Sequence, residues 1–517
     1  MLLRKMLWLS VLWLIAEAGV YGQTYDVKKF GAAGDKKAND TAAIQAAIDA
    51  CARSGGGTVW FPGGDYLSGT IRLRSNVTLQ LDPGATVWSS REPGDYDKSA
   101  RYLVVAQDAE NIALVGRGTL RGIGEADLGR RPADPKAQDL KFRAGILKFS
   151  DCKDISIRDV KMLYSDTWTV HLRQCENVVI DGLTILNNYY RTNSDGIDPV
   201  SCKNVHISNC HIVAGDDCIV LKSTEKQPCE NVVVTNCTLE SIATALKLGT
   251  ESPGDFRNVH FSNCSIRNST VGIGLFLKDG ATMERITFSH IDVETCPADD
   301  STNLTKSSCP IFVDIEKRHP DSKIGRIRDL AFDDIQIHSN AGVLIQGMPE
   351  SAIENLALTN ITLRVSNPAD YSARRKHVGG RRTTKDERDT LYARKPTYCA
   401  LAHVKGLSVD NLRVLMTEAD YAKYERSALE GSEMENCVLR NVFRSPSGAG
   451  GSGPVISLRN CRGALVTDCL TEPGTPCVVA LFGEKTANIS VGAAGLQAAA
   501  RTLIASPEVP TGAAKTP

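Results

Sequence analysis

Hydrophobic and polar residues repeat along this chain with a period of 27 residues. Near copies of one pattern begin at Cys175, Cys202 and Cys229, and the same phase continues at Phe256. Each copy alternates apolar and polar side chains, which is typical of a strand with one buried face. One coil of this length cannot bury its apolar face alone, but stacked coils can. The period therefore predicts an all-β fold, a right-handed parallel β-helix of roughly a dozen coils.

A second phase of the repeat predicts the turns and the state of the cysteines. Asn209-Cys210, Asn236-Cys237 and Asn263-Cys264 are also 27 residues apart. Asparagine suits turn positions because it tolerates left-handed backbone. The cysteines of both phases are expected in inward columns, where cysteine acts as a small buried hydrophobe. Parallel Cβ vectors on stacked coils are poor geometry for disulfides, so we expect free thiols in these columns.

A helix is expected at the N-terminal end of the solenoid. Asp40 is placed to cap it, and Ile44, Ala47, Ile48 and Cys51 fall on one face. Such a helix would cover the open end of the coils, which otherwise exposes unpaired strand edges.

The remaining segments complete the expected domain organisation. Residues 23–497 are assigned to the β-helix catalytic domain, which is interrupted by a basic excursion loop at 372–394. A solvated loop is the simpler interpretation of that segment, and a lip meeting an anionic glycan is the other. Residues 498–517, rich in Ala, Thr and Pro, are expected to form a flexible tail.

Residues 1–22 have the pattern of a secretory signal peptide. Arg4 and Lys5 precede an apolar run from Met6 to Ala16, and small residues follow up to Gly22. The run is shorter than the ~20 residues that span a bilayer, which favours export over the alternative of a membrane anchor. We therefore expect a secreted or periplasmic protein with no membrane span after signal cleavage.

Composition narrows the possible partners. The 517 residues include 60 Lys+Arg and 60 Asp+Glu, so the formal net charge is zero. A protein without a basic field has no general means of holding nucleic acid, so no nucleic-acid partner is expected. We expect a monomer.

Three carboxylates are expected to meet on neighbouring coils. Aligning the copies places Asp195 and Asp217 in one column, with Asp216 beside them. Like charges that close raise at least one pKa, which is the condition for pairing a general acid with ionised bases. A glycosidase needs such a set. A calcium site and aspartates used only in turns are the alternatives. Asp198 lies on the same strand but out of phase.

At these positions the sequence resembles the family 28 glycoside hydrolases, the polygalacturonase and rhamnogalacturonase group. Its motifs there are Asn-Thr-Asp-Gly-Ile/Phe-Asp and Gly-Asp-Asp-Cys, matched by Asn193–Asp198 and Gly215–Cys218. The resemblance implies a right-handed parallel β-helix and inverting hydrolysis with three aspartates, without metal or cofactor. Asp216 would be the general acid, and Asp195 and Asp217 would activate water.

Two other family motifs are incomplete in this chain. Thr244 stands where polygalacturonases carry a histidine, and Phe276-Leu277-Lys278 keeps the lysine of an Arg-Ile-Lys motif but not its arginine. In the family that Arg and Lys pair holds a galacturonate carboxylate. The departures indicate a divergent, bacterial branch that acts on a pectic polysaccharide or oligosaccharide of galacturonide or rhamnogalacturonan type.

Four residues are expected to bind the substrate, namely Asn193, Lys222, Lys247 and Lys278. A solvated strand lysine is the simpler interpretation of each lysine alone. Two other functions stay open at this point. One is a non-catalytic glycan-binding β-helix, and the other is a polysaccharide lyase, which would need a calcium-binding acidic cluster and a basic residue to take the proton.

Overall fold

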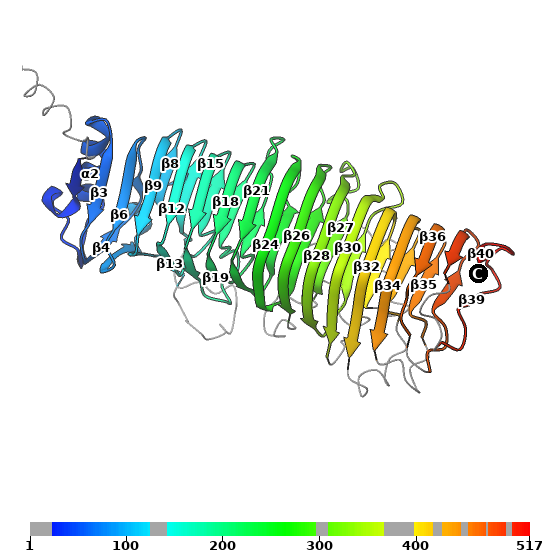
Figure 1. The fold of residues 1–517 in the computed structure, drawn as a ribbon. Coiled ribbons are helices and arrows are strands. Elements are labelled where there is room, and N and C mark those ends of the chain that lie inside the picture. Colours follow the sequence, from blue (N-terminus) through cyan, green and yellow to red (C-terminus); the bar gives the residue numbers. More distant parts are fainter. Residues whose placement is uncertain are drawn as a thin grey trace, which may run out of the picture.

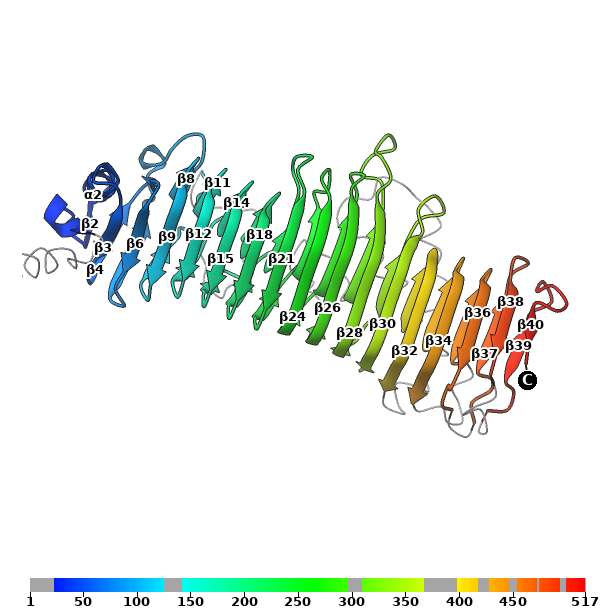
Figure 2. The same ribbon diagram turned by 45° about the horizontal axis from the view of Figure 1, so that its top comes forward.

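The computed structural model describes residues 23–124, 142–295, 309–366, 398–416, 427–445, 453–471, 474–492 and 499–516. The expected signal peptide at 1–22 and the basic loop at 372–394 lie outside the described residues. Strands stack along one axis into an elongated solenoid, with the N-terminal helix at one end and the C-terminus at the other (Figures 1 and 2). None of the described helices is long and apolar enough to cross a membrane.

The strands form two parallel sheets, here called sheet A and sheet B. Sheet B has 15 strands in chain order, so the solenoid has somewhat more coils than the expected dozen. These are β5 (Ile71–Arg72), β8 (Tyr102–Gln107), β11 (Gly145–Ser150), β14 (Val170–Arg173), β17 (Ile197–Val200), β20 (Ile219–Leu221), β23 (Thr244–Thr250), β25 (Val271–Leu277), β27 (Cys309–Ile315), β29 (Val343–Gln346), β31 (Cys399–Ala402), β33 (Leu429–Ser432), β35 (Ile456–Arg459), β37 (Val479–Phe482) and β39 (Leu503–Ala505).

Sheet A has 25 strands, because most of the N-terminal coils contribute two short strands and later coils one long strand. They are β1 (Thr24–Asp26), β2 (Asp35–Asn39), β3 (Gly57–Phe61), β4 (Gly64–Ser68), β6 (Val77–Leu81), β7 (Ala85–Ser89), β9 (Glu110–Gly116), β10 (Thr119–Arg121), β12 (Lys153–Arg158), β13 (Lys161–Leu163), β15 (Glu176–Asp181), β16 (Thr184–Leu186), β18 (Lys203–Ser208), β19 (His211–Ala214), β21 (Cys229–Thr235), β22 (Thr238–Ser241), β24 (Phe256–Ser269), β26 (Thr282–Thr295), β28 (Arg326–Ser339), β30 (Ile353–Val365), β32 (Val404–Met416), β34 (Glu435–Ser445), β36 (Arg462–Thr467), β38 (Ala487–Val491) and β40 (Ala514–Lys515). Since parallel crossovers of this kind are right-handed, the right-handed parallel β-helix predicted from the repeat is confirmed.

The 27-residue phase is the register of sheet A. Val178 pairs with Val205, and Val205 pairs with Val232, so one apolar residue per coil fills the same inward column. All three are fully buried. Beside this column, within β18 and β21, Asn204 and Asn231 adopt left-handed backbone with φ of 55° and 57°. Asn209, Asn236 and Asn263 adopt it as predicted, with φ of 56°, 57° and 54°. The amide of Asn231 donates to that of Asn204 at 3.0 Å, which continues a ladder of asparagine side chains.

The expected N-terminal helix is α2 (Thr41–Arg53), and its four apolar residues are buried as predicted. Asp40 occupies the N-cap position, but its side chain does not cap the helix, contrary to expectation. The Asp40 carboxylate instead accepts hydrogen bonds from the backbone N–H groups of Ala33 (2.7 Å) and Gly34 (3.1 Å), which fixes the preceding loop. Two 3₁₀ helices, η1 (Val27–Phe30) and η2 (Pro93–Asp95), complete the described helices.

The C-terminal segment from 498, expected to be a flexible tail, differs from that expectation in its described part. β39 pairs with β37 and β40 pairs with β38, so the segment continues both sheets. Leu503 and Val509 pack against the core, and Ala513 is buried. These few apolar contacts are sufficient to seat another coil on the preformed one, even though the composition is that of a loop.

The cysteine columns agree with the expectation of free thiols. The fifteen cysteines within the described ranges are all free and buried. Burial raises the pKa of the Cys229 thiol to about 12. Such a buried thiol stays protonated at ordinary pH and is an unreactive core residue. Hydrogen bonds with Cys210 and Cys264 instead lower the pKa of Cys237 to about 4, but its side chain is buried as well.

Candidate active site

The three expected catalytic carboxylates lie where neighbouring coils enter sheet B. Ile197 on β17 pairs with Ile219 on β20, which places Asp195 and Asp217 at the same phase, as the alignment of the copies predicted. One carboxylate oxygen from each of Asp195, Asp216 and Asp217 lies within 4.8 Å of the others. The fold thus brings together the three aspartates that the sequence singled out.

Asp216 is the most accessible of the three carboxylates. It is half-buried, whereas Asp195 and Asp217 are 2% and 1% exposed. Its Oδ2 accepts a hydrogen bond from the backbone N–H of Asn193 at 3.1 Å. Asn193 is exposed, with a left-handed φ of 56°, and its side-chain Oδ1 accepts from Arg143 at 3.2 Å. Asn193 therefore lies at the accessible edge of the carboxylate cluster.

Asp195 shares a buried ammonium group with Asp198. The Nζ of Lys222 lies 3.3 Å from Asp195 Oδ2 and 3.1 Å from Asp198 Oδ1, and the Lys222 side chain is only 6% exposed. The same Nζ lies 3.7 Å from the centre of the Trp168 ring, a cation–π contact. Lys222 is thus enclosed by the protein.

The pKa values of both aspartates are raised. Burial is the main cause, and Lys222 opposes it while the neighbouring aspartates add to it; the pKa of Asp195 rises well above its usual range and that of Asp198 to about 7. Clustered carboxylates were expected to raise at least one pKa, and the raised pKa values are those of the buried Asp195 and Asp198. Desolvation of these two side chains contributes more to the rise than repulsion by the neighbouring carboxylates. Within the described part of the chain, Asp195 Oδ1 accepts no hydrogen bond.

Asp217 is held by the next coil. Its Oδ2 lies 2.6 Å from Nζ of Lys247, and its Oδ1 accepts from the backbone N–H of Thr244 at 3.2 Å. Thr244, which replaces the histidine of the family motif, is itself buried. The coil that lacks the histidine therefore still positions Asp217, through a backbone donor and a lysine.

Lys278 lies further along sheet B and has a partner that the sequence did not reveal. Its Nζ is 2.9 Å from Oε2 of Glu316, and both side chains are 4% exposed. Phe276, in place of the family arginine, packs on Phe312 with ring centres 5.0 Å apart. All three lysines expected to bind substrate thus have carboxylates of the protein itself as partners.

Sequence reasoning also missed an aromatic cluster beside Lys222. His171 contacts the Trp168 ring edge-on at 4.7 Å, and its Nδ1 lies 3.2 Å from the hydroxyl of Tyr102. Burial, and then the charges of Lys148 and Lys222, lower the pKa of His171 to about 3, so the ring is neutral at ordinary pH. None of these residues belongs to a repeated motif, and β14, which carries His171, gave no signal beyond its position next to β17.

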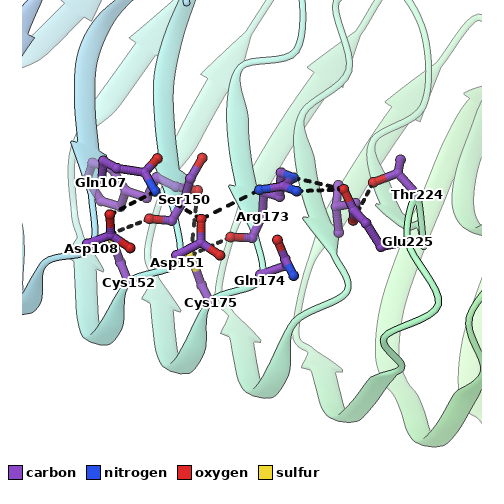
Figure 3. Close-up of polar contacts among 12 residues, drawn as sticks. Gln107, Asp108, Ser150, Asp151, Cys152, Arg173, Gln174, Cys175, Thr224 and Glu225 are labelled. Carbon is purple, nitrogen blue, oxygen red and sulfur yellow. Dashed lines mark hydrogen bonds and ion pairs between the residues drawn. The ribbon is translucent and has the colours of Figure 1, made fainter.

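A separate polar ladder follows the other end of the sheet B strands (Figure 3). Arg173, at the end of β14, donates to Glu225 at 2.7 Å and lies 3.5 Å from Asp151. Gln107 also donates to Asp151, at 3.0 Å. The ladder links successive coils by half-exposed ion pairs and is distinct from the buried pairs of the carboxylate cluster.

Curated plant proteins named as polygalacturonases match part of this chain. A "Probable polygalacturonase" from Vitis vinifera is 31% identical over 215 residues, covering 38% of this chain and 43% of that protein. An "Exopolygalacturonase" from Zea mays is 27% identical over 209 residues, covering 40% of this chain and 50% of that protein. The chain spans about half the length of these curated relatives.

Solved structures share the fold. The exopolygalacturonase from Thermotoga maritima matches with a TM-score of 0.56 and 22% identity, over 66% of this chain and 87% of that one. The polygalacturonase from Erwinia carotovora ssp. carotovora matches with a TM-score of 0.52 and 20% identity, over 63% of this chain and 90% of that one. At this identity the likeness establishes the β-helix alone.

The family itself is established by a model match that covers more than half of the chain. The model described as glycosyl hydrolases family 28 matches residues 51–374, a range that includes all three carboxylates and the lysines beside them. The resemblance noted from Asn193–Asp198 and Gly215–Cys218 is thereby confirmed. The chain belongs to family 28 of the glycosyl hydrolases, a family of glycoside-cleaving enzymes.

Proposed function

We propose that this protein is a secreted glycoside hydrolase that cleaves glycosidic bonds of pectic polysaccharides or oligosaccharides with inversion of configuration. The observation that carries the proposal is the set of three carboxylates with oxygens within 4.8 Å of one another on adjacent coils of a family 28 member. The relatives named as polygalacturonases support the pectic substrate.

Each carboxylate has a role that suits its surroundings. Asp216, the accessible one, is the general acid and gives its proton to the leaving glycosidic oxygen as the C–O bond breaks. Asp195 and Asp217 bind one water between them and take its proton as its oxygen attacks the anomeric carbon. Lys247 stabilises the ionised form of Asp217, and Lys222 offsets part of the pKa rise that burial gives Asp195.

Inversion is proposed although the carboxylates are close together. In a site with two carboxylates, inverting enzymes separate them by about 6.5–9.5 Å and retaining enzymes by about 5–5.5 Å. Here two bases flank a single water, so the separation of one acid–base pair does not measure the space for that water. NMR of the first-formed product anomer tests this step, and a retained anomer would contradict inversion.

Replacing the acid tests the hydrolase directly. We expect Asp216→Asn to abolish reducing-sugar release from galacturonan, rhamnogalacturonan I and rhamnogalacturonan II fragments while the circular dichroism spectrum is unchanged. Asp151→Asn is the matched control, because Asp151 belongs to the ladder of Figure 3 and not to the carboxylate cluster. A fully active Asp216→Asn protein would overturn the proposal.

Catalysis without a metal ion is part of the same proposal. Three clustered carboxylates are also the ligand type that calcium prefers, as a lyase would require. The two lysines already supply positive charge to Asp195 and Asp217. We expect full activity in excess EDTA and products without the ultraviolet absorption of an unsaturated sugar, and the opposite pair of results would favour a lyase.

A further inference from the structure

The buried ion pair of Lys278 and Glu316 bears on which sugar fits next to the catalytic carboxylates. Both side chains are 4% exposed and their charged atoms are 2.9 Å apart. Glu316 directly follows β27, and its backbone N–H donates to the carbonyl of Leu277 at 2.9 Å, which fixes it beside Lys278. A substrate carboxylate would have to displace a preorganised, desolvated carboxylate of the protein to reach this lysine, which costs far more than capturing a free ammonium group.

Among the described residues over β23, β25 and β27, the neighbouring cations are engaged in the same way. Lys247 lies 2.6 Å from Asp217, and Phe276 places an aromatic ring where the family motif has an arginine. Arg318 holds Asp279 with two hydrogen bonds, of 2.6 and 2.8 Å. The cations that line this part of sheet B, over β23, β25 and β27, therefore have internal partners.

Charge also opposes a uronate at this position. Each of the three lysines near the carboxylates is engaged by a carboxylate of the protein, Lys222 by Asp195 and Asp198, Lys247 by Asp217 and Lys278 by Glu316. A further carboxylate brought into this low-dielectric cluster would compete with those internal partners, whereas hydroxyl groups hydrogen-bond to carboxylates and lysines without that cost.

We propose that the sugar ring seated over β23 and β25, next to the bond that is cleaved, is an uncharged hexose or deoxyhexose and not a uronic acid. This inference rests on the proposed function and deepens it by naming the substrate class. The substrate is then a pectic chain that contains neutral residues, and the enzyme acts where such a residue occupies the ring position beside the carboxylates.

The first test compares oligosaccharides that differ only in charge. The wild-type protein is assayed with galacturonan oligomers, with the same oligomers after reduction of each carboxylate to a primary alcohol, and with rhamnogalacturonan I oligomers. We expect kcat/KM for the reduced or the alternating oligomer to exceed that for galacturonan at least about tenfold. Equal or faster cleavage of galacturonan would overturn this inference and leave the proposed function standing, whereas cleavage of no pectic oligomer would overturn both.

The second test releases the lysine. Glu316→Gln removes the internal partner of Lys278, and we expect cleavage of galacturonan oligomers to improve about tenfold or more relative to the reduced oligomers. Glu225→Gln, which breaks the pair with Arg173 shown in Figure 3, is the matched control and should change neither rate. A folded Glu316→Gln protein with an unchanged preference would contradict the inference.

A double variant covers the case in which Glu316→Gln does not fold because Lys278 is left buried without its partner. Lys278→Gln combined with Glu316→Gln removes both charges and keeps groups able to hydrogen-bond. We expect this protein to retain the wild-type preference for the uncharged ring. A switch of preference to galacturonan in the double variant would contradict the inference, because no ammonium group is then left at position 278 to hold the uronate carboxylate.

Discussion

Lys222 and Lys247 each place an ammonium group against a buried carboxylate of the candidate active site. The distances are 3.3 Å to Asp195 and 2.6 Å to Asp217, and the lysine side chains are 6% and 14% exposed. Desolvating such pairs is costly, and removing one partner leaves an uncompensated charge. We propose that these lysines set the charge of the carboxylates, and the substrate contact expected from the sequence stays a prediction.

Replacing Lys247 tests this role through the pH profile. Lys247→Met removes the ammonium group from Asp217, and a carboxylate that loses a neighbouring positive charge takes up a proton more readily. We expect kcat to fall roughly 100-fold and the acid limb of the kcat/KM profile to move to higher pH. Lys247→Arg keeps the charge and should restore much of the rate. A lower rate with an unmoved profile would show a merely structural role.

His171 gives a second residue-scale prediction, for stability. Its native pKa of about 3 lies below the value of about 6.5 expected in an unfolded chain. Between these pH values the unfolded state binds more protons, so this residue lowers stability as pH falls from about 6.5 towards 3. Between pH 7 and pH 4.5, we expect the urea midpoint of His171→Gln to fall less than that of the wild type.

The comparison isolates His171 because other groups titrate in both proteins. The charges that face the ring are those of Lys148, Lys222 and Arg173, with Asp198 opposite on the adjacent strand. The raised pKa values of Asp195 and Asp198 affect the pH curves of both proteins. Their contributions cancel in the difference between the curves as long as the His171 ring is uncharged. Parallel curves for the two proteins would mean that His171 is protonated in the native state.

The asparagine ladder of sheet A carries the prediction at the scale of elements. Asn231 donates to Asn204 at 3.0 Å, accepts from Asn258 at 2.8 Å and has a φ of 57°. Asn231→Ala loses both hydrogen bonds and also forces a Cβ residue without a local hydrogen bond into left-handed backbone, for an expected loss of about 2–3 kcal/mol in the free energy of unfolding.

Glycine at the same position separates the two contributions. Asn231→Gly loses the hydrogen bonds but adopts this backbone without strain, so we expect it to be about 1 kcal/mol more stable than Asn231→Ala in urea unfolding. If alanine proved as stable as glycine, the ladder and not the backbone conformation would account for the recurring asparagine.

The same repeat explains which features of the structure could be predicted from the sequence. A constant coil length places residues of equal phase side by side, so the inward columns and the left-handed asparagines were predictable. Asp195 and Asp217 are 22 residues apart, and their meeting was predictable because the two motifs that carry them could be aligned. The prediction failed where the coil is longer and no motif marks the partner. Val271 pairs with Cys309, so the coil after β25 is longer than 27 residues and Glu316 lies opposite Lys278 without any periodic signal.

The hydrogen-bond and ion-pair partners of side chains were less predictable from the sequence than their positions in the fold. Aligned copies put Lys222, Lys247 and Lys278 on neighbouring coils but did not show whether each ammonium group faces solvent or a carboxylate. The choice depends on burial, which is set by strands packed from other coils. Asp40 shows the same limit, because its helix position was predicted while its carboxylate turned to Ala33 and Gly34.

At the scale of the whole molecule, sheet A provides the regular stabilising repeat and sheet B carries the expected catalytic residues. Sheet A repeats its register closely and carries the asparagine ladder, whereas the expected catalytic residues lie at or near sheet B on a few consecutive coils. Because each coil contacts only its neighbours, the site depends on the coils that flank it and the long C-terminal extension of the solenoid adds coils without adding to the carboxylate cluster.

The buried thiols give a prediction for the molecule as a whole. All fifteen described cysteines are free and inward-facing, and burial raises the pKa of Cys229, Cys309 and Cys399 to about 12. A protonated thiol in a packed core neither attacks a reagent nor exchanges with a disulfide. We expect the native protein to react with few equivalents of a thiol reagent, and nearly all of its cysteines to react in denaturant. Its melting temperature should be the same with and without a reductant, since stability comes from stacked coils and not from cross-links. A melting temperature that falls under reducing conditions would show that this β-helix uses disulfides after all.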